Sequence, residues 1–426
     1  MKKLNSLLVI GLVAVFTFAT SSCSKEEGCT DENAINYDPD AEEDDGSCVY
    51  DENTDLITKS GEITSDETWS SDNIYRLKGR VYVTNGATLT IEPGTVIKAD
   101  PGQGAFASAL IIRRDGMIDA AGTTNEPIIF TSIADDIEPG MIESPNLEPT
   151  QNGLWGGVII LGEARISAQN DNGQDVTELQ IEGIPTSEDA LYGGNNDAHN
   201  SGTFTYVSIR HGGSNIGAGN EINGLSLGGV GSGTTINNIE IVANQDDGIE
   251  WFGGNVDIDN VVVWNSGDDG LDTDQDWIGT CTDFIVVTPI GGSGFELDGP
   301  EGSLNRGAHQ FTNGVVYAGS DIDHLVDWDD NTNAGVKDVY FYGFDASYPE
   351  SGFEPVESFG GDGSGDNGNW EYTLASGGAD AATIFTGVPG AALTEVTTAG
   401  KTVGPDASEF GWTWAGASGA LAGIGL

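Results

Sequence analysis

The chain has 426 residues, 63 of them glycine, and 38% of them are hydrophobic, which excludes a largely disordered protein and favours short strands joined by turns. Its 15 basic and 68 acidic residues give a formal net charge of −53, so nucleic acid and anionic lipid headgroups are excluded as partners, whereas divalent cations are favoured.

The first 22 residues are typical of a bacterial export signal. A basic start is followed by an apolar stretch, residues 7–18, that is too short to span a bilayer. Residues 21–23, Ser-Ser-Cys, then resemble the cleavage box of bacterial lipoproteins. The resemblance implies that Cys23 carries the lipid and becomes the mature N-terminus. An ordinary secretory signal is the alternative.

Residues 24–27, Ser-Lys-Glu-Glu, resemble the export signal of surface lipoproteins of Bacteroidota. That signal places a basic residue and two acids directly after the lipid-bearing cysteine. The resemblance implies that the protein is anchored in the outer membrane by its lipid and displayed on the outer face. A polar linker has a similar composition.

Residues 23–50 are expected to contain a small acidic module after the lipidated N-terminus. The segment 29–48 resembles a module related to thrombospondin-type calcium repeats. Its crowded carboxylates, of a type that Ca²⁺ prefers, are Asp38, Asp40, Asp44 and Asp45. Cys29 and Cys48 bracket these acids and could pair as a disulfide in an oxidising compartment. A solvated acidic linker is the alternative, and residues 51–71 are read as a linker.

Residues 72–359 are predicted to form a parallel β-helix. A short phrase recurs with Gly224, Gly248, Gly270 and Gly294 at intervals of 22 to 24 residues, which is too short for a helix-pair repeat and suits one coil of a solenoid. The residues between the glycines alternate with period two and are rich in β-branched side chains. A second phrase opens an apolar strand in each repeat, at Asn238, Asn260, Asp283 and Asp338.

From Trp69 onward the chain loosely resembles right-handed β-helix lipoproteins of Bacteroidota, which have a pectate-lyase-like architecture. The resemblance implies an all-β, single-stranded, right-handed parallel β-helix solenoid. Residues 360–426 comprise a glycine-rich loop and an aromatic tail that includes Trp412 and Trp414. Because the end of a solenoid has to be covered, this part is predicted to be an aromatic C-terminal cap. Cys281 is expected to be a buried thiol.

The aligned phrases predict columns of acidic side chains along the solenoid. Alternation places two residues of each phrase inward and the residue between them outward. The inward positions are Ile249, Leu271, Phe295 and Val326, followed by Trp251, Thr273, Leu297 and Trp328. The first outward column contains Glu250, Asp272, Glu296 and Asp327, and a second contains Asp274, Asp298 and Asp329.

Coils stack at about 4.8 Å, and carboxylates at that spacing repel by roughly 1 kcal/mol per pair in water and more in a groove of lower dielectric constant. The columns therefore predict a cation-binding face with oxygen ligands, with Ca²⁺ as the expected ion. Turn acids add charge to the same region: Asp246, Asp247, Asp268, Asp269 and Asp276. Plain surface charge is the alternative for the columns.

The acidic face also allows a catalytic interpretation. Residues 267–270, Gly-Asp-Asp-Gly, faintly resemble the paired-acid motif of polygalacturonases, but the companion Gly-His-Gly and Arg-Ile-Lys motifs are missing. If the protein is an enzyme, the expected catalytic residues are Asp268, Asp269, Asp272, Arg210 and His211.

The sequence thus predicts a calcium-stabilised β-helix that is lipid-anchored in the outer membrane and exposed on the cell surface. We expect it to bind extracellular polysaccharide or matrix without catalysis. A polysaccharide lyase or glycoside hydrolase that uses the acidic face is the first alternative, and a purely structural surface protein is the second.

Overall fold

The structure is a computed structural model that describes residues 27–30, 41, 43–44, 56–170, 172–185, 189–215, 222–287, 292–319, 322, 324–328, 331–344 and 367–426. The chain divides into two units, Met1–Thr54 and Asp55–Leu426. None of the described helices has the length and apolar character needed to cross a bilayer.

In the first unit, the described strands β1 (Glu27–Gly28) and β2 (Glu43–Asp44) pair in parallel. Cys29 is buried. The predicted lipidation at Cys23 and the pairing of Cys29 with Cys48 stay predictions, because Cys23 and Cys48 lie outside the described residues. The same holds for Asp38, Asp40 and Asp45, and the side chain of Asp44 is also outside them.

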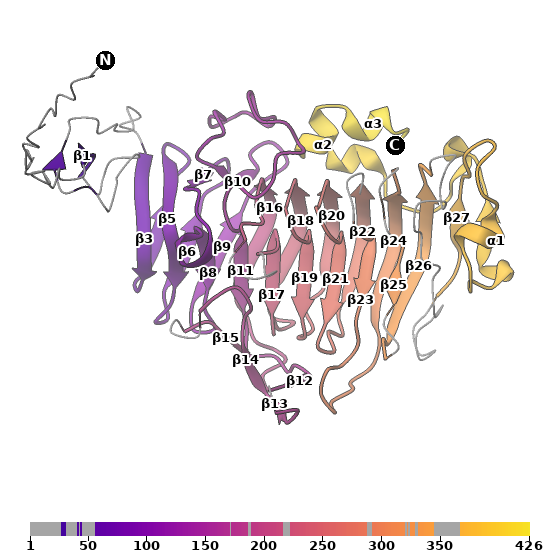
Figure 1. The fold of residues 1–426 in the computed structure, drawn as a ribbon, viewed down its shortest axis with the longest axis horizontal. Helices are drawn as coiled ribbons and strands as arrows, with labels where there is room; N and C mark the ends of the chain where they lie inside the picture. Colours follow the sequence, from indigo (N-terminus) through magenta and orange to yellow (C-terminus); the bar gives the residue numbers. More distant parts are fainter. Residues whose placement is uncertain are drawn as a thin grey trace, which may run out of the picture. The chain divides into compact units, whose positions relative to one another are not determined.

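The second unit is built around one sheet of 22 strands, shown in Figure 1. The strands of its first coils are β3 (Leu56–Ile63), β4 (Glu67–Trp69), β5 (Ile74–Val83), β6 (Thr88–Ile91), β7 (Val96–Ala99), β8 (Ala109–Ile112), β9 (Met117–Ala121), β10 (Ile128–Ser132) and β11 (Val158–Leu161). The later coils contain β16 (Gly202–Arg210), β17 (Leu225–Gly228), β18 (Thr235–Val242), β19 (Ile249–Phe252), β20 (Ile258–Trp264), β21 (Leu271–Asp274), β22 (Thr280–Val287), β23 (Phe295–Leu297), β24 (His309–Tyr317), β25 (Asp327–Trp328), β26 (Ala334–Tyr342), β27 (Trp370–Tyr372) and β28 (Leu393–Glu395).

Long and short strands alternate along the later coils, and each strand pairs in parallel with its counterpart one coil on. The long strands pair in the order β16, β18, β20, β22, β24 and β26, and the short strands in the order β17, β19, β21, β23 and β25. This topology is that of a parallel β-helix, so the predicted fold class is confirmed.

Each long strand bends once, at a residue with a left-handed backbone. These residues include Asn238 (φ 54°), Asn260 (φ 59°), Asp283 (φ 56°) and Asp338 (φ 57°), the same residues that form the second repeated phrase. Asn and Asp are the non-glycine residues that adopt this conformation most readily. The bend divides each long strand into a first arm and a second arm. We call the outer surfaces of the coils the first-arm face, the second-arm face and the short-strand face.

The core is formed by inward side chains that stack from coil to coil. Ile249, Leu271, Phe295 and Val326 are all buried in the main core cluster, as are Trp251, Leu297 and Trp328. The inward positions predicted from the repeated phrases are therefore confirmed. Cys281 is a buried free cysteine in this core, as predicted.

The second-arm face is covered by the C-terminal part of the chain, which contains η3 (Thr398–Gly400), η4 (Ala407–Phe410), α2 (Trp414–Ala417) and α3 (Ala420–Gly423). Phe410 and Leu421 pack on Val262, Ile285 and Val315, and α2 and α3 lie along the ends of the strands in Figure 1. Trp412 meets Tyr206 edge-on, and Trp414 packs on Val242.

The end of the core is covered by a different part of the tail. Ile384 of α1 (Ala381–Ile384) and the adjacent Phe385 join the main core cluster beside Phe341, Trp370 and Tyr372. The predicted cap is thus divided: residues near α1 close the end, whereas Trp412 and Trp414 lie on the side of the coils. The reason is that the outward side chains of the second arms are apolar and require their own cover.

The short-strand face is covered in its middle coils by an insertion of residues 162–200. It contains two antiparallel hairpins, β12 (Ala168–Gln169) with β13 (Asp175–Val176) and β14 (Glu178–Gln180) with β15 (Leu191–Gly193). Ile166, Ile181 and Tyr192 of the insertion pack against Leu161 and Phe252 of the coils. The remaining short elements are the 3₁₀ turns η1 (Gly104–Phe106) and η2 (Gly390–Ala392).

Side chains that stack in neighbouring coils must have complementary volumes, which gives a first prediction. Phe284 pairs with Gly314, and a Cβ at Gly314 would overlap the Phe284 ring. We expect Gly314→Ala to lower the free energy of unfolding by about 1–3 kcal/mol in urea titrations. Adding Phe284→Leu should restore part of the loss, because the smaller side chain makes room for the methyl group. An unchanged midpoint for Gly314→Ala would contradict this account of the core.

Candidate functional site

The first acidic column has the predicted register. Glu250 pairs with Asp272, Asp272 with Glu296, and Glu296 with Asp327, in successive short strands. The carboxylates therefore stand on the short-strand face, one coil above the next, at the strand spacing of about 4.8 Å.

The second column is partly described. Asp274 pairs with Phe252, and the backbone N–H of Asp298 donates to Thr273 O at 2.8 Å, one residue before Asp274. Asp329 lies outside the described residues. Burial and the nearby carboxylates of Glu301 and Asp298 raise the pKa of Asp274 well above its usual value.

The acids closest to the insertion are buried, which the alternation of the strands did not predict. Glu250 is 7% and Asp272 8% exposed. Over them lies Tyr192 of the insertion, whose ring centroid is 5.9 Å from that of Phe252. The Tyr192 hydroxyl donates to Gln275 Oε1 at 2.8 Å. The carboxylates point outward from the coil, but into the space beneath the insertion rather than into open solvent.

A turn residue joins the column to form a compact acidic cluster. Carboxylate oxygens of Asp247, Glu250 and Asp272 all lie within 4.8 Å of one another. Asp247 is also buried, at 7% exposure. We call these three residues the acid triad. A second group of carboxylates, of Asp246, Asp247 and Asp268, adjoins it and is more exposed.

Asp247 belongs to a third stacked column, at the position before the repeated glycine. Asp247 Oδ1 accepts a 2.9 Å hydrogen bond from the backbone N–H of Asp269, one coil on. Asp269 Oδ1 in turn accepts from the N–H of Ser293. Both acids therefore hydrogen-bond the turn of the next coil, and Asp247 also contributes to the acid triad.

The same position one coil earlier holds Asn223, which the sequence analysis missed. Asn223 is 1% exposed, and its Nδ2 donates to Glu250 Oε2. Its Oδ1 has no hydrogen-bond partner among the described residues. A half-turn of the amide would exchange the two atoms and turn a carbonyl oxygen toward the triad. The site would then offer three carboxylates and one amide oxygen. These are oxygen ligands of the kind that binds Ca²⁺. The alignment of Asn223-Gly224 with Asp247-Gly248 was the signal that could have identified it.

Burial makes the charged form of the triad costly. It raises the pKa of Asp247, Glu250 and Asp272 well above their usual values, and neighbouring carboxylates raise them further. Burial and Asp269 raise the pKa of Glu296 to about 9. Carboxyl groups in this environment either keep protons at neutral pH or share a cation.

Asp327 differs from the other members of its column. His324 Nδ1 lies 3.0 Å from Asp327 Oδ2, and this contact lowers the pKa of Asp327. The structure therefore brings together Glu250 and Asp272 of the predicted column with Asp247, while Asp327 has a partner of its own.

The residues proposed for catalysis fall into two environments. Arg210 is the last residue of β16 and His211 follows it; both are fully buried. Arg210 Nη2 lies 3.6 Å from Glu240 Oε2, and the Trp414 ring lies 5.0 Å from the guanidinium. His211 Nδ1 bonds to Gln151 O at 2.5 Å. These two residues thus belong to a buried network under the C-terminal segment. Asp268 and Asp269 lie in the turn before β21, and Asp272 in β21.

The first-arm face is polar and accessible. One outward column runs through paired strands and consists of Thr205, Asn237, Asp259, Thr282 and Thr312. A hollow on this face is lined by Ser232, Thr234, Thr235, Asn237, Asp257, Asp259, Thr280 and Thr282. Asp259 is exposed, whereas its four column neighbours are half-buried. The same alternation predicts this column, but apart from Asp259 its side chains are uncharged and do not stand out in the sequence.

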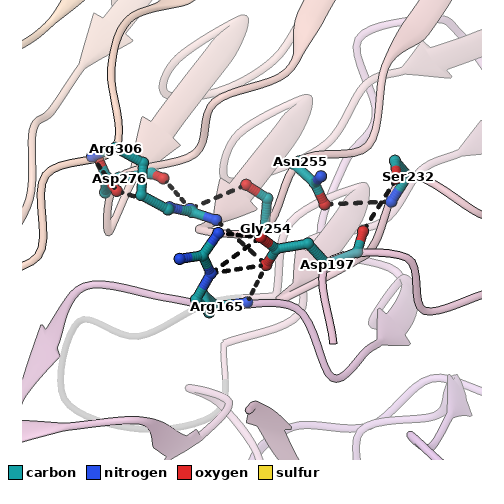
Figure 2. Close-up of polar contacts among 7 residues, drawn as sticks. All are labelled: Arg165, Asp197, Ser232, Gly254, Asn255, Asp276 and Arg306. Atoms are coloured by element: carbon teal, nitrogen blue, oxygen red, sulfur yellow. Dashed lines mark hydrogen bonds and ion pairs between the residues drawn. The ribbon is translucent and has the colours of Figure 1, made fainter. Parts of the chain in front are cut away.

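A network of ion pairs ties the insertion to the coils (Figure 2). Arg165 Nε donates to Asp197 Oδ2 at 2.9 Å. Arg306 Nε donates to Asp276 Oδ2 at 2.8 Å, and its Nη2 donates to Gly254 O at 3.1 Å. Arg306 also lies 3.7 Å from Asp197. Its buried guanidinium therefore contacts both Asp197 of the insertion and Asp276 of the coils.

Comparison with known proteins gives one match. Residues 61–326, more than half of the chain, match the family described as a pectate-lyase like beta helix domain. No curated protein and no solved structure gives a significant match.

The raised pKa values predict how stability changes with pH in a chelator. Over most of the range from pH 7 to pH 9 folded Glu296, with a pKa of about 9, keeps its proton, and the raised pKa values of the acid triad act in the same direction. Unfolded carboxyls titrate at about 4 and are ionised. The free energy of unfolding should therefore fall as pH rises, by about 1.4 kcal/mol per pH unit for each proton retained. His309, with its pKa lowered to about 3, is largely neutral in both states in this window.

Urea titrations in EDTA at pH 7, 8 and 9 measure this slope. A free energy of unfolding that stays constant or rises across the three pH values would contradict the protonated state of the buried acids.

Proposed function

The chain belongs to the pectate-lyase-like β-helix domain family, and on that basis we propose that it is a surface protein that binds extracellular glycan or matrix without catalysis. The observation that carries this proposal is the polar first-arm face, which stays accessible while the C-terminal segment covers the second-arm face and the insertion covers the middle of the short-strand face.

The first-arm face has polar groups suited to binding an extended polyol. Hydroxyl, amide and carboxylate groups recur on it in register, for example at Asn237, Asp259 and Thr282. Their spacing along the solenoid is the strand spacing of about 4.8 Å. A polysaccharide also presents hydroxyl groups at regular intervals, and uncharged hydroxyls avoid the repulsion that a chain of net charge −53 exerts on anionic polymers.

We propose that Ca²⁺ stabilises the coils at the acid triad. Asp247, Glu250 and Asp272 would hold the ion, with the Asn223 amide oxygen as a further ligand. The support is the buried, all-oxygen donor set and the unpartnered Asn223 Oδ1. A bound divalent cation would offset the mutual repulsion of the carboxylates and the cost of burying them.

Catalysis by a lyase or a hydrolase is the alternative within the same family. Such an enzyme needs an acid and a base that reach the substrate. The burial of Arg210 and His211 under Trp414 favours the binding function instead.

The location on the cell surface is also a proposal. It rests on the resemblance of residues 21–27 to lipoprotein processing and export signals. In this proposal Cys23 carries the lipid that anchors the protein in the outer membrane. A fully extracellular binding module is consistent with the oxygen-ligand site, because Ca²⁺ is abundant outside cells.

Removing the acids should remove the response to calcium. We expect CaCl₂ to raise the melting temperature of the wild-type protein, by a stabilisation of about 2.7 kcal/mol at a concentration one hundred times the Kd. The variant Glu250→Gln/Asp272→Asn/Glu296→Gln should melt at the same temperature with CaCl₂ and with EDTA. The control Asp136→Asn/Glu138→Gln/Glu148→Gln makes the same charge change at exposed positions. If the first variant keeps the wild-type calcium response, the triad is not the site.

Glycan binding is tested on a glycan array with the mature protein in CaCl₂ and in EDTA, together with a turnover assay on the bound polysaccharides. We expect binding without depolymerisation, and at least tenfold weaker binding for Asn237→Ala/Thr282→Ala, which loses two polar groups of the first-arm face. Shortened polysaccharide chains would identify an enzyme, and absence of all glycan binding would identify a structural protein.

A further inference from the structure

A second recess lies on the insertion side of the molecule. It has a volume of about 320 Å³ and is formed where hairpin β12–β13 meets a loop after β23. This volume is at the lower end of the range for small-molecule sites. We call it the insertion pocket, and its lining residues include Arg165, Ile166, Ser167, Ala168, Val176 and Leu304.

The floor of the insertion pocket is apolar and rigidly held. Ile166 and Ala168 are 3% and 1% exposed and pack in the cluster beneath the insertion. Between them, Ser167 is fixed through its backbone: its N–H donates to Gln275 O at 2.9 Å, and its carbonyl accepts from the N–H groups of Glu301 and Gly302, both at 3.1 Å.

The Ser167 side chain has an unused hydrogen-bonding capacity. Ser167 is 2% exposed, yet its Oγ has no hydrogen-bond partner among the described residues. A buried hydroxyl without a partner is unfavourable, because it has lost its hydrogen bonds to water. Because Ser167 lines the pocket, a ligand hydroxyl there would satisfy it.

Two charged side chains at the pocket are held in place by the protein itself. Arg165 donates to Asp197 through Nε and Nη2, and Figure 2 shows its remaining terminal nitrogen directed away from Asp197. Asp175 accepts from the backbone N–H and the hydroxyl of Ser303. The pocket therefore offers an oriented donor, an oriented acceptor and a hydroxyl around an apolar floor.

This combination matches one uncharged sugar ring. A pyranose has an apolar C–H face and hydroxyl groups that both donate and accept. An anionic sugar is disfavoured, because the charge of Arg165 is already paired with Asp197, because Asp175 adds a negative charge, and because the whole chain carries −53.

The pocket also lies next to the first-arm face. Asp197 connects the two, since its side chain holds Arg165 of the pocket and its backbone carbonyl accepts from Ser232 Oγ at 3.0 Å. Ser232 lines the hollow on the first-arm face. Figure 2 shows Asp197 between Arg165 and Ser232. A polymer lying on the first-arm face could therefore reach the pocket with its terminal residue.

We propose that the insertion pocket binds one neutral pyranose residue at the end of the glycan. This inference rests on the proposed glycan-binding function and names the part of the ligand that gives specificity. Val176 and Leu304, the half-buried apolar residues of the lining, would contact the C–H face, while Ser167, Arg165 and Asp175 would bind hydroxyl groups.

The test measures binding of glucose, galactose, mannose and glucuronate by calorimetry, and their competition with the polysaccharides found on the array. We expect at least one neutral sugar to bind and compete, and glucuronate not to bind. Val176→Phe, which fills the pocket from a half-buried strand position, should weaken that sugar at least tenfold. Ser167→Ala should weaken it about fivefold to tenfold, in line with one lost hydrogen bond.

Met141→Phe serves as the control, since it enlarges an exposed apolar side chain in a different insertion and should leave sugar binding unchanged. Wild-type sugar affinity in both Val176→Phe and Ser167→Ala would overturn the pocket assignment. Binding of glucuronate alone would also overturn it. If the protein binds glycans on the array but no neutral sugar competes with them, the pocket assignment is wrong while the proposed function stands. If the wild-type protein binds neither glycans nor sugars, both proposals fail.

Discussion

In-register stacking of parallel strands is the interaction on which the rest of this structure depends. It places equivalent residues of successive coils in contact, so every repeated position becomes a column. A column of apolar side chains forms the core and needs no partner outside the coils. A column of acids such as Glu250, Asp272 and Glu296 accumulates charge that the coils alone cannot neutralise. A bulky side chain such as Phe284 leaves space only for glycine at its counterpart, Gly314.

The covering segments change what these columns can do. On the short-strand face, Tyr192 and its neighbours exclude water from Glu250 and Asp272 and so turn a surface feature into a buried one. The lower dielectric constant raises the cost of ionisation and favours either protons or a divalent cation. On the first-arm face the column from Thr205 to Thr312 stays accessible to partners. The division of the molecule into covered faces and an accessible face follows from where the chain covers itself.

Much of the coil geometry could be predicted from residue patterns. The glycine phrases predicted the pairing of Glu250 with Asp272, and the Asn and Asp residues of the second phrase proved to be left-handed bends. The parts that could not be predicted all depend on contacts between distant segments. The burial of Glu250 depends on the insertion, and that of Arg210 on Trp414, more than 200 residues away. Neither segment has the repeat period, so periodicity carries no information on where it packs. Asn223 was missed because its amide does not look acidic, although its place in the phrase is equivalent to that of Asp247.

The path of the C-terminal segment has a consequence for how the solenoid unfolds. A linear array of coils ordinarily loses structure from its ends, since each coil touches only its neighbours. Here the backbone N–H of Ala415 donates to Glu240 of β18 at 2.9 Å, while Phe410 and Leu421 share a cluster with Tyr340 of β26. The C-terminal segment therefore bridges coils from β18 to β26. Because these contacts join coils that are not neighbours, we expect the coils from β18 to β26 to unfold together rather than one at a time from an end.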